Sequence, residues 1–281
     1  MKISNVLEFH KQLIYIRRTY YNIVEAQKSC WRLEQITRKW WLYLILFAIL
    51  FFVPPYSSAA GFIMGEKSSE VVAEVLTQSL KPYKPFTPLL HIIVILFVAA
   101  VLVYGNRFGR FFTAFVGINY LIIAFLQNVA ITEKYGLGII TVNLIWFPLI
   151  SLLWLHDVRV GKTDYTFHMQ PLWKYWVIPL AVLAFWSPDK PWDFNPIYLL
   201  TSDAPLAFCL ITPVYLSIFY LLYPKVNLPA LRVTSFIGAI LGIFNIVIGF
   251  MIWGSEGLYH GFIHVPLLTL FLCCFILSIK G

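Results

Sequence analysis

Eight apolar segments, each close to the length that crosses a lipid bilayer, alternate with short polar loops along most of this chain. A helix crosses the hydrocarbon core in about 20 residues, so such segments predict transmembrane helices. The fifth segment is short and contains Pro179, and we expect it to be tilted or to borrow flanking residues. The predicted fold is an all-α integral membrane protein, a bundle of about eight transmembrane helices. The predicted spans are residues 40–64, 86–104, 110–127, 137–156, 172–186, 198–223, 233–253 and 260–279.

The composition agrees with a membrane protein. Of the 281 residues, 60% are hydrophobic and only 12% are charged, whereas soluble domains carry about 25% charged residues. The net charge of +8 does not indicate nucleic-acid binding, because nucleic-acid binders gather their charge on a folded polar domain and this sequence contains none. We therefore expect no nucleic-acid partner and assign the positive charge to inside-facing loops and anionic lipid.

Basic residues are concentrated in the N-terminal segment and in every second loop, which predicts an orientation. When the chain is threaded from a cytoplasmic N-terminus, sixteen of its 21 Lys and Arg residues fall inside. The five on the outer side are Lys67, Lys81, Lys84, Lys134 and Lys190. Because cytoplasmic loops carry the excess of Lys and Arg, the sequence predicts a multi-pass protein of the cell membrane with both termini in the cytoplasm.

Residues 1–39 form a separate N-terminal segment ahead of the transmembrane bundle of residues 40–281. Within it, apolar residues recur at helical spacing and basic residues lie between them, as in an amphipathic helix. The apolar residues are Phe9, Leu13, Ile16, Tyr20 and Ile23, and the basic ones are Lys11, Arg17, Arg18, Lys28, Arg32, Arg38 and Lys39. We expect this leader helix to lie on the anionic lipid of the inner leaflet. Docking to a partner subunit is the alternative.

Two small-residue features of the spans predict local geometry. Gly238 and Gly242 form a GxxxG pair, a pattern that admits the close approach of another helix. Prolines inside the spans each remove a backbone donor and are expected to kink their helices. They are Pro54, Pro55, Pro148, Pro179, Pro205, Pro213 and Pro266.

Polar residues inside the spans share one depth. They lie in the middle or outer half of six different spans, at His91, Asn119, Gln127, Asn143, Asp203, Asn245, His260 and His264. Because ionisable groups in hydrocarbon are costly and usually face a bundle interior or a wet cavity, this distribution predicts an outward-facing polar pocket. We expect Asp203, His91, Asn143 and Asn245 to bind a small solute or ion there.

The histidines suggest a second use for the same pocket. His260 and His264 stand one helical turn apart on one face, a spacing that lets two imidazoles address one ion. With His91 as a third ligand they would form a divalent metal site, for example for zinc, with Asp203 adding an oxygen. A b-type haem held by His91 and one of the pair is also open. Structural hydrogen bonding remains the simpler alternative, and Asp203, which precedes Ala204 and Pro205, also fits a helix N-cap.

Three functional classes therefore remain open. The first is a protein that binds or transports a small solute or ion. The second is a membrane-embedded enzyme that depends on a metal or haem, and the third is an accessory subunit of a larger complex. The chain contains no Walker A, GxSxG, HExxH or CxxCH motif, so the sequence names no reaction.

The predicted orientation can be tested by cysteine accessibility. Cysteine probes at Glu70, Glu133 and Asp193 should react with an impermeant reagent added outside the cell, whereas probes at Lys162 and Lys225 should not, because the basic loops remain on the cytoplasmic side. Outside labelling at Lys162 would overturn the eight-span topology.

Overall fold

The computed structural model describes residues 24, 25, 27–188, 193–252 and 254–280. This part of the chain is mostly helical. Five of its helices are long and apolar enough to cross a membrane, and the number rises to seven if each of two bent pairs counts as one span. By helix length and composition the protein is a multi-pass membrane protein.

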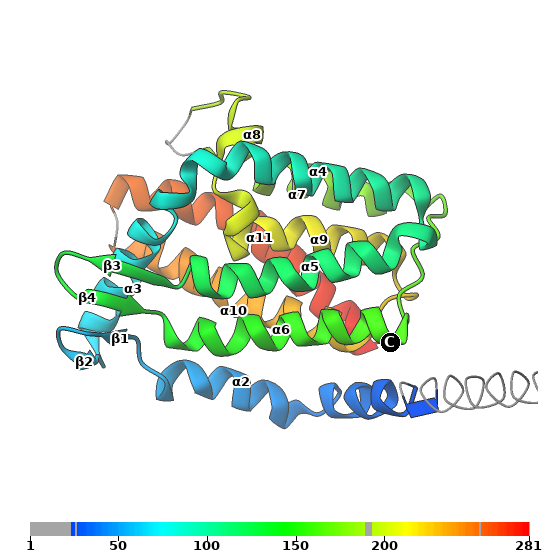
Figure 1. Ribbon diagram of the computed structural model, residues 1–281, viewed down its shortest axis with the longest axis horizontal. Helices are drawn as coiled ribbons and strands as arrows, with labels where there is room; N and C mark the ends of the chain where they lie inside the picture. Colours follow the sequence, from blue (N-terminus) through cyan, green and yellow to red (C-terminus); the bar gives the residue numbers. More distant parts are fainter. Residues whose placement is uncertain (1–23, 26, 189–192, 253, 281) are drawn as a thin grey trace, which may run out of the picture.

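The long helices lie side by side along the long axis of the molecule (Figure 1). They are α2 (Trp40–Phe52), α4 (Thr87–Tyr104), α5 (Asn106–Leu126), α6 (Thr141–Val160), α7 (Val177–Trp186), α9 (Phe208–Leu222), α10 (Leu228–Ile252) and α11 (Gly254–Lys280). Shorter helical pieces join them: α3 (Glu66–Ser79), η1 (Lys81–Phe86), η2 (Leu172–Trp176), α8 (Tyr198–Thr201) and η3 (Ala204–Leu206).

A small antiparallel sheet and α3 cover one end of the bundle, at the left of Figure 1, and we call this unit the cap. The strands are β1 (Tyr56–Ser57), β2 (Gly61–Phe62), β3 (Val129–Thr132) and β4 (Gly136–Ile139), in the order β2-β1-β4-β3. Helix α3 packs on the sheet so closely that a Cβ atom at Gly138 would lie 2.5 Å from Val75. The cap holds the loops after α2 and α5 against each other.

The cap corrects two predicted boundaries. The first span was expected to reach residue 64 and the fourth to begin at 137, but α2 ends at Phe52 and α6 begins at Thr141. Pro54 and Pro55 have no backbone N–H to continue α2, and residues 136–139 pair with β1 and β3 in the sheet. The prediction of an all-α protein therefore holds for the bundle and misses the cap.

The predicted sixth span is broken rather than kinked. Residues 198–206 and 208–222 meet at an angle of 94°. The break falls at η3, which contains Pro205, whereas α9 continues through Pro213. The predicted fifth span is a short apolar helical stretch, Leu172–Trp186, that begins as the 3-10 turn η2.

The predicted GxxxG pair, Gly238 and Gly242 of α10, forms a packing face within the chain, which we call the glycine stripe. A Cβ atom at Gly238 would lie 2.6 Å from the ring of Phe271 on α11, and one at Gly242 would lie 3.4 Å from Leu268. The prediction that the GxxxG pair admits a neighbouring helix is confirmed, and that neighbour is α11.

The leader is described only in part, because residues 1–23 lie outside the described residues. Its last helix, Gln27–Thr37, meets α2 at an angle of 70°. The guanidinium of the buried Arg232 on α10 joins this helix to α11, donating to the carbonyls of Ser278 (2.8 Å) and Glu34 (3.4 Å) and to the Thr37 hydroxyl (3.3 Å). Because both carbonyls lie near helix C-termini, the cation faces the negative ends of two helix dipoles. The described end of the leader thus docks on its own bundle.

The glycine stripe gives a stability prediction. Gly238→Ala should destabilise the purified protein by about 1 to 3 kcal/mol, because the new methyl group overlaps the Phe271 ring in a packed interface. Gly242→Ala is the matched control and should cost clearly less, since its methyl group would only touch Leu268. Thermal unfolding in detergent would check this, and Phe271→Leu should restore the Gly238→Ala variant. Equal losses at the two glycines would contradict the packing argument.

Candidate functional site

Polar side chains from α4 bind the first half of the broken helix. His91 is fully buried, and its Nδ1 lies 2.8 Å from the carbonyl of Thr87, while its Nε2 lies 3.1 Å from the hydroxyl of Ser202. The Ser202 hydroxyl also lies 3.0 Å from the carbonyl of Phe185, and the Phe185 ring packs on the imidazole. Thr87 donates to the carbonyl of Thr201 at 3.3 Å. Both nitrogens of His91 are therefore occupied: Nδ1 bonds a carbonyl of its own helix, and Nε2 joins α4 to Ser202 at the break.

Polar side chains from α5 bind the second half of the break. Asn119 donates to the carbonyl of Pro205 at 3.0 Å and accepts a hydrogen bond from the Tyr215 hydroxyl at 3.1 Å. Gln127 accepts the backbone N–H of Phe208 at 3.0 Å. The regular helical hydrogen-bond pattern is interrupted at such a bend, and in an apolar environment side chains must supply partners for the backbone groups that it leaves.

A cavity of about 560 Å³ lies between the cap and the bundle. The helix α3 forms one wall, and the ends of α2, α5, α6, α7 and α9 with α10 and α11 form the others. Its apolar lining includes Leu50, Phe51, Val53, Val72, Leu76, Phe147, Phe208, Leu210, Leu241, Phe244 and Ile263, and its polar lining includes Ser68, Ser69, Gln127, Thr141, Asn143, Asn245 and His264. No Asp, Glu, Lys or Arg is among its described lining residues.

Asn143 is the polar centre of this cavity. Its Nδ2 donates to Oδ1 of Asn128 at 2.7 Å, and Asn128 in turn donates to the carbonyls of Ile123 and Ala124 at the end of α5, each at 3.1 Å. These bonds fix the orientation of the Asn143 amide. Asn143 is only 7% exposed. Its Oδ1 atom is buried and accepts no hydrogen bond from the described residues. A buried acceptor without a donor is costly, and the described residues leave this one unsatisfied.

Two further polar residues of the cavity come from α10 and α11. Asn245 donates to the sulfur of Cys209 at 3.4 Å. His264 is 9% exposed and lines the cavity from α11. The side chain of His260, the other member of the predicted histidine pair, lies outside the described residues.

An ionic contact within the cap joins α3 to the turn between β3 and β4. The ammonium of Lys134 and the hydroxyl of Tyr135 both donate to Oε2 of Glu70 on α3, at 2.7 and 2.8 Å. These hydrogen bonds lower the pKa of Glu70, and the bond to Glu70 raises the pKa of Lys134. Because the pKa of Glu70 is lowered in the folded state, the stabilisation that its carboxylate gives is lost only as the pH falls through that lowered pKa. The contact therefore persists at neutral pH.

The structure divides the predicted site residues between two places. Asn143, Asn245 and His264 line one cavity, whereas His91 and Asp203 are not among its lining residues. Asp203 is half-buried at the start of η3, and its side chain makes no capping hydrogen bond. Asp203 thus occupies the N-cap position that the sequence suggested, but without the expected side-chain hydrogen bond. Among the described residues, no group of three His, Cys, Asp or Glu side chains could hold a metal ion.

Sequence reasoning missed a second cavity, of about 470 Å³, which has a polar lining and lies at the opposite end of the bundle. Arg110 and Asp157 are among its lining residues. Asp157 is 2% exposed and sits in the last turn of α6, one residue beyond the predicted fourth span. A carboxylate in the last turn of a helix interacts unfavourably with the helix dipole. The position of Asp157 at the end of an apolar segment could therefore have indicated that hydrogen-bond donors surround it.

Comparisons with protein-family models, with curated proteins and with solved structures found no match to this chain.

The bonds of His91 predict a structural rather than a metal-binding role. His91→Ala should lower stability by about 1 to 3 kcal/mol, because the buried Thr87 carbonyl and Ser202 hydroxyl lose a partner. The metal content of the purified protein, measured by elemental analysis, should not change. His168→Ala removes an exposed histidine and is the control. A stoichiometric metal that is present in the unaltered protein and lost from His91→Ala would contradict this assignment.

Proposed function

We propose that this protein binds a small, neutral, mainly apolar solute with one polar end, in the cavity beneath the cap. The single observation that carries the proposal is the largely apolar lining of this cavity, which includes Asn143, whose buried Oδ1 atom has no donor among the described residues. A volume of about 560 Å³ lies within the range of small-molecule sites, which are mostly apolar with a few placed polar groups.

The chemistry of the lining supports a neutral ligand. An ion bound in an apolar bundle requires a countercharge or several oxygen ligands to offset its desolvation. The described lining offers amides, hydroxyls and one imidazole, but no carboxylate, ammonium or guanidinium. A ligand hydroxyl or N–H group donating to Asn143 would satisfy the buried acceptor, while its apolar part contacts residues such as Phe147, Leu241 and Phe244.

We further propose that the cap faces the outside of the cell and that α7 and the broken helix complete a bundle of eight crossings. The turn between α4 and α5, the end of α6 and the turn before α10 all lie at the end opposite the cap (Figure 1). These segments carry Arg107, Arg110, Arg159, Lys162 and Lys225. Basic residues gathered at one end of a bundle favour the cytoplasmic side for that end. Solute would then enter from the outer face.

The two other functional classes have less support. A metal or haem enzyme built on His91 would need a ring nitrogen that the contacts with Thr87 and Ser202 already use. An accessory role based on the glycine stripe would need a free helix face, but α11 occupies that stripe. Neither class explains the buried acceptor of Asn143.

Photolabelling can test the proposed cavity. A diazirine-bearing medium-chain primary alcohol should label peptides that line the cavity in the full-length protein, as mapped by mass spectrometry, because its hydroxyl can donate to Asn143. Val72→Trp, which fills the cavity from α3 without removing a polar group, should reduce this labelling by about tenfold, the effect of losing about 1.4 kcal/mol of binding. Thr77→Trp places the same side chain on the exposed face of α3 and is the matched control.

The charge of the probe should decide how well it binds in this cavity. A carboxylate of the same length should label the cavity weakly, since the lining has no cation to offset its desolvation. Labelling spread evenly over lipid-facing residues, unchanged by Val72→Trp, would refute the proposal.

A further inference from the structure

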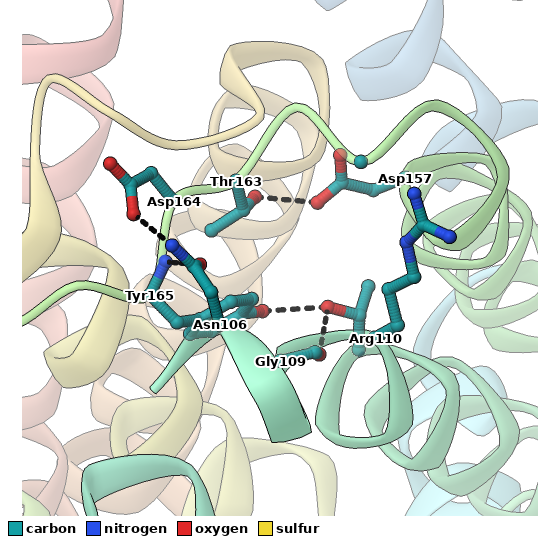
Figure 2. A pocket seen from close by; sticks show the side chains of 9 residues that line it. Asn106, Gly109, Arg110, Asp157, Thr163, Asp164 and Tyr165 are labelled. Atoms are coloured by element: carbon teal, nitrogen blue, oxygen red, sulfur yellow. Dashed lines mark hydrogen bonds between the residues drawn. The ribbon is translucent and has the colours of Figure 1, made fainter. Parts of the chain in front are cut away.

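The cavity of about 470 Å³ at the end opposite the cap lies where the N-terminus of α5 meets the C-terminus of α6. Figure 2 shows its lining side chains, with Arg110 reaching from α5 toward the loop that follows α6. The lining consists of Asn106, Gly109, Arg110, Thr113, Asp157, Gly161, Thr163, Asp164 and Tyr165. This lining carries both charges, in contrast to that of the cavity beneath the cap.

Part of this lining is internally satisfied. Asn106 donates to Oδ1 of Asp164 at 2.6 Å and accepts the backbone N–H of Tyr165 at 2.6 Å. Tyr165 shares a hydrogen bond with Thr113 at 2.7 Å. Hydrogen bonds from Thr166 and Asn106 lower the pKa of Asp164, which also lies 3.5 Å from the ammonium of Lys225. These residues form a fixed wall with little capacity left for a ligand.

Arg110 is different, because its guanidinium has no hydrogen bond or ion pair within the described part of the chain. The group lies close to the end of α6, where a Cβ atom at Gly161 would be 3.4 Å from Nη2. Gly161 has a φ of 64° and no side chain, so it leaves room beside the cation. A guanidinium presents five N–H donors in a planar fork that matches carboxylate and phosphate oxygens.

Asp157 supplies the opposite charge without meeting Arg110. Its Oδ1 accepts the backbone N–H of Lys162 at 2.9 Å and Nδ2 of Asn227 at 3.0 Å, and its Oδ2 accepts the Thr163 hydroxyl at 2.5 Å. All three donors are neutral, and no Lys, Arg or His nitrogen of the described residues lies within 4.0 Å of the carboxylate. Figure 2 accordingly draws no bond between Asp157 and Arg110. A cation and an anion thus line one cavity without pairing.

The cavity lies beside the lipid-facing surface. Phe111, next to Arg110 on α5, is 66% exposed, and Tyr104 at the end of α4 is 61% exposed. Aromatic rings at a helix end are typical of the membrane interface, at the level of the lipid headgroups. A headgroup could therefore reach Arg110 from the side, and a soluble molecule could reach it from the aqueous face.

We propose that this cavity binds a zwitterion that carries a primary ammonium and a phosphate, with the phosphate on Arg110 and the ammonium on Asp157. A ligand of this kind matches both unpaired charges at once, whereas a simple anion would meet the repulsion of Asp157. The ammonium must carry N–H donors, because Asp157 can offer only acceptors. The chemistry is that of a phosphoethanolamine group, either as the headgroup of a membrane lipid or free in solution.

Binding measurements with defined probes would test the site. The full-length protein in detergent would be titrated with short-chain phosphatidylethanolamine, phosphatidylcholine and phosphatidylglycerol, and separately with O-phosphoethanolamine, using native mass spectrometry or thermal shift. Phosphatidylethanolamine should bind about tenfold more tightly than phosphatidylcholine, since the quaternary ammonium of choline cannot donate a hydrogen bond to Asp157. A response to O-phosphoethanolamine alone would assign a soluble source, and a response to the lipid alone would assign the headgroup.

Two variants separate the roles of the charges. Arg110→Gln should weaken the binding of phosphatidylethanolamine by about tenfold, whereas Arg107→Gln, which removes an exposed arginine of the same helix outside the cavity lining, should have little effect. Asp157→Asn keeps the shape of the side chain and should abolish the preference over phosphatidylcholine while strengthening the binding of phosphatidylglycerol. Equal binding of the three lipids to the unaltered protein, no binding of any probe, or equal losses at Arg110 and Arg107 would overturn the proposal.

Discussion

The arrangement of the bundle depends on satisfying backbone groups where a helix breaks inside apolar surroundings. Residues 198–206 and 208–222 meet at 94°, and water cannot supply the missing hydrogen bonds within the bundle. The side chains of Thr87, Asn119 and Gln127 bond backbone groups at the break, and His91 bonds the side-chain hydroxyl of Ser202 beside it. The break in turn exposes the start of α9 to the cavity beneath the cap. One local irregularity thus sets the positions of α4, α5 and α7 and forms part of a ligand site.

The two ends of the bundle differ in chemistry for a physical reason. Beneath the cap, the described lining is apolar with amides and hydroxyls, so a ligand there need not bring a countercharge. At the opposite end, where the N-terminus of α5 meets the C-terminus of α6, the lining includes the ionisable side chains of Arg110 and Asp157. The proposed solute site and the proposed headgroup site are therefore matched to their depths along the same bundle.

Several features that would suit a partner subunit are used within the chain. The glycine stripe of α10 packs against Phe271 and Leu268 of α11. The described end of the leader is held by the guanidinium of Arg232, which interacts with the C-terminal ends of two helices. The first contact covers the glycines with side chains of α11, and the second gives the carbonyls of Ser278 and Glu34 a donor. The Arg232 contact ties Glu34 and Thr37 of the leader to the bundle.

The sequence alone determined the membrane class, several of the long apolar helices and the glycine packing face. These properties depend on bilayer thickness and on backbone hydrogen bonding, which act on neighbouring residues and can be read along one helix. Only the tertiary structure decided which polar residues line a cavity and which join helices. His91 bonds Ser202 at the broken helix, whereas Asn143 is among the residues that line the cavity beneath the cap, and that difference depends on neighbours far away in the sequence. The two-residue strands of the cap and the shared cavity of Arg110 and Asp157 were hidden for the same reason, since contacts between distant segments create them.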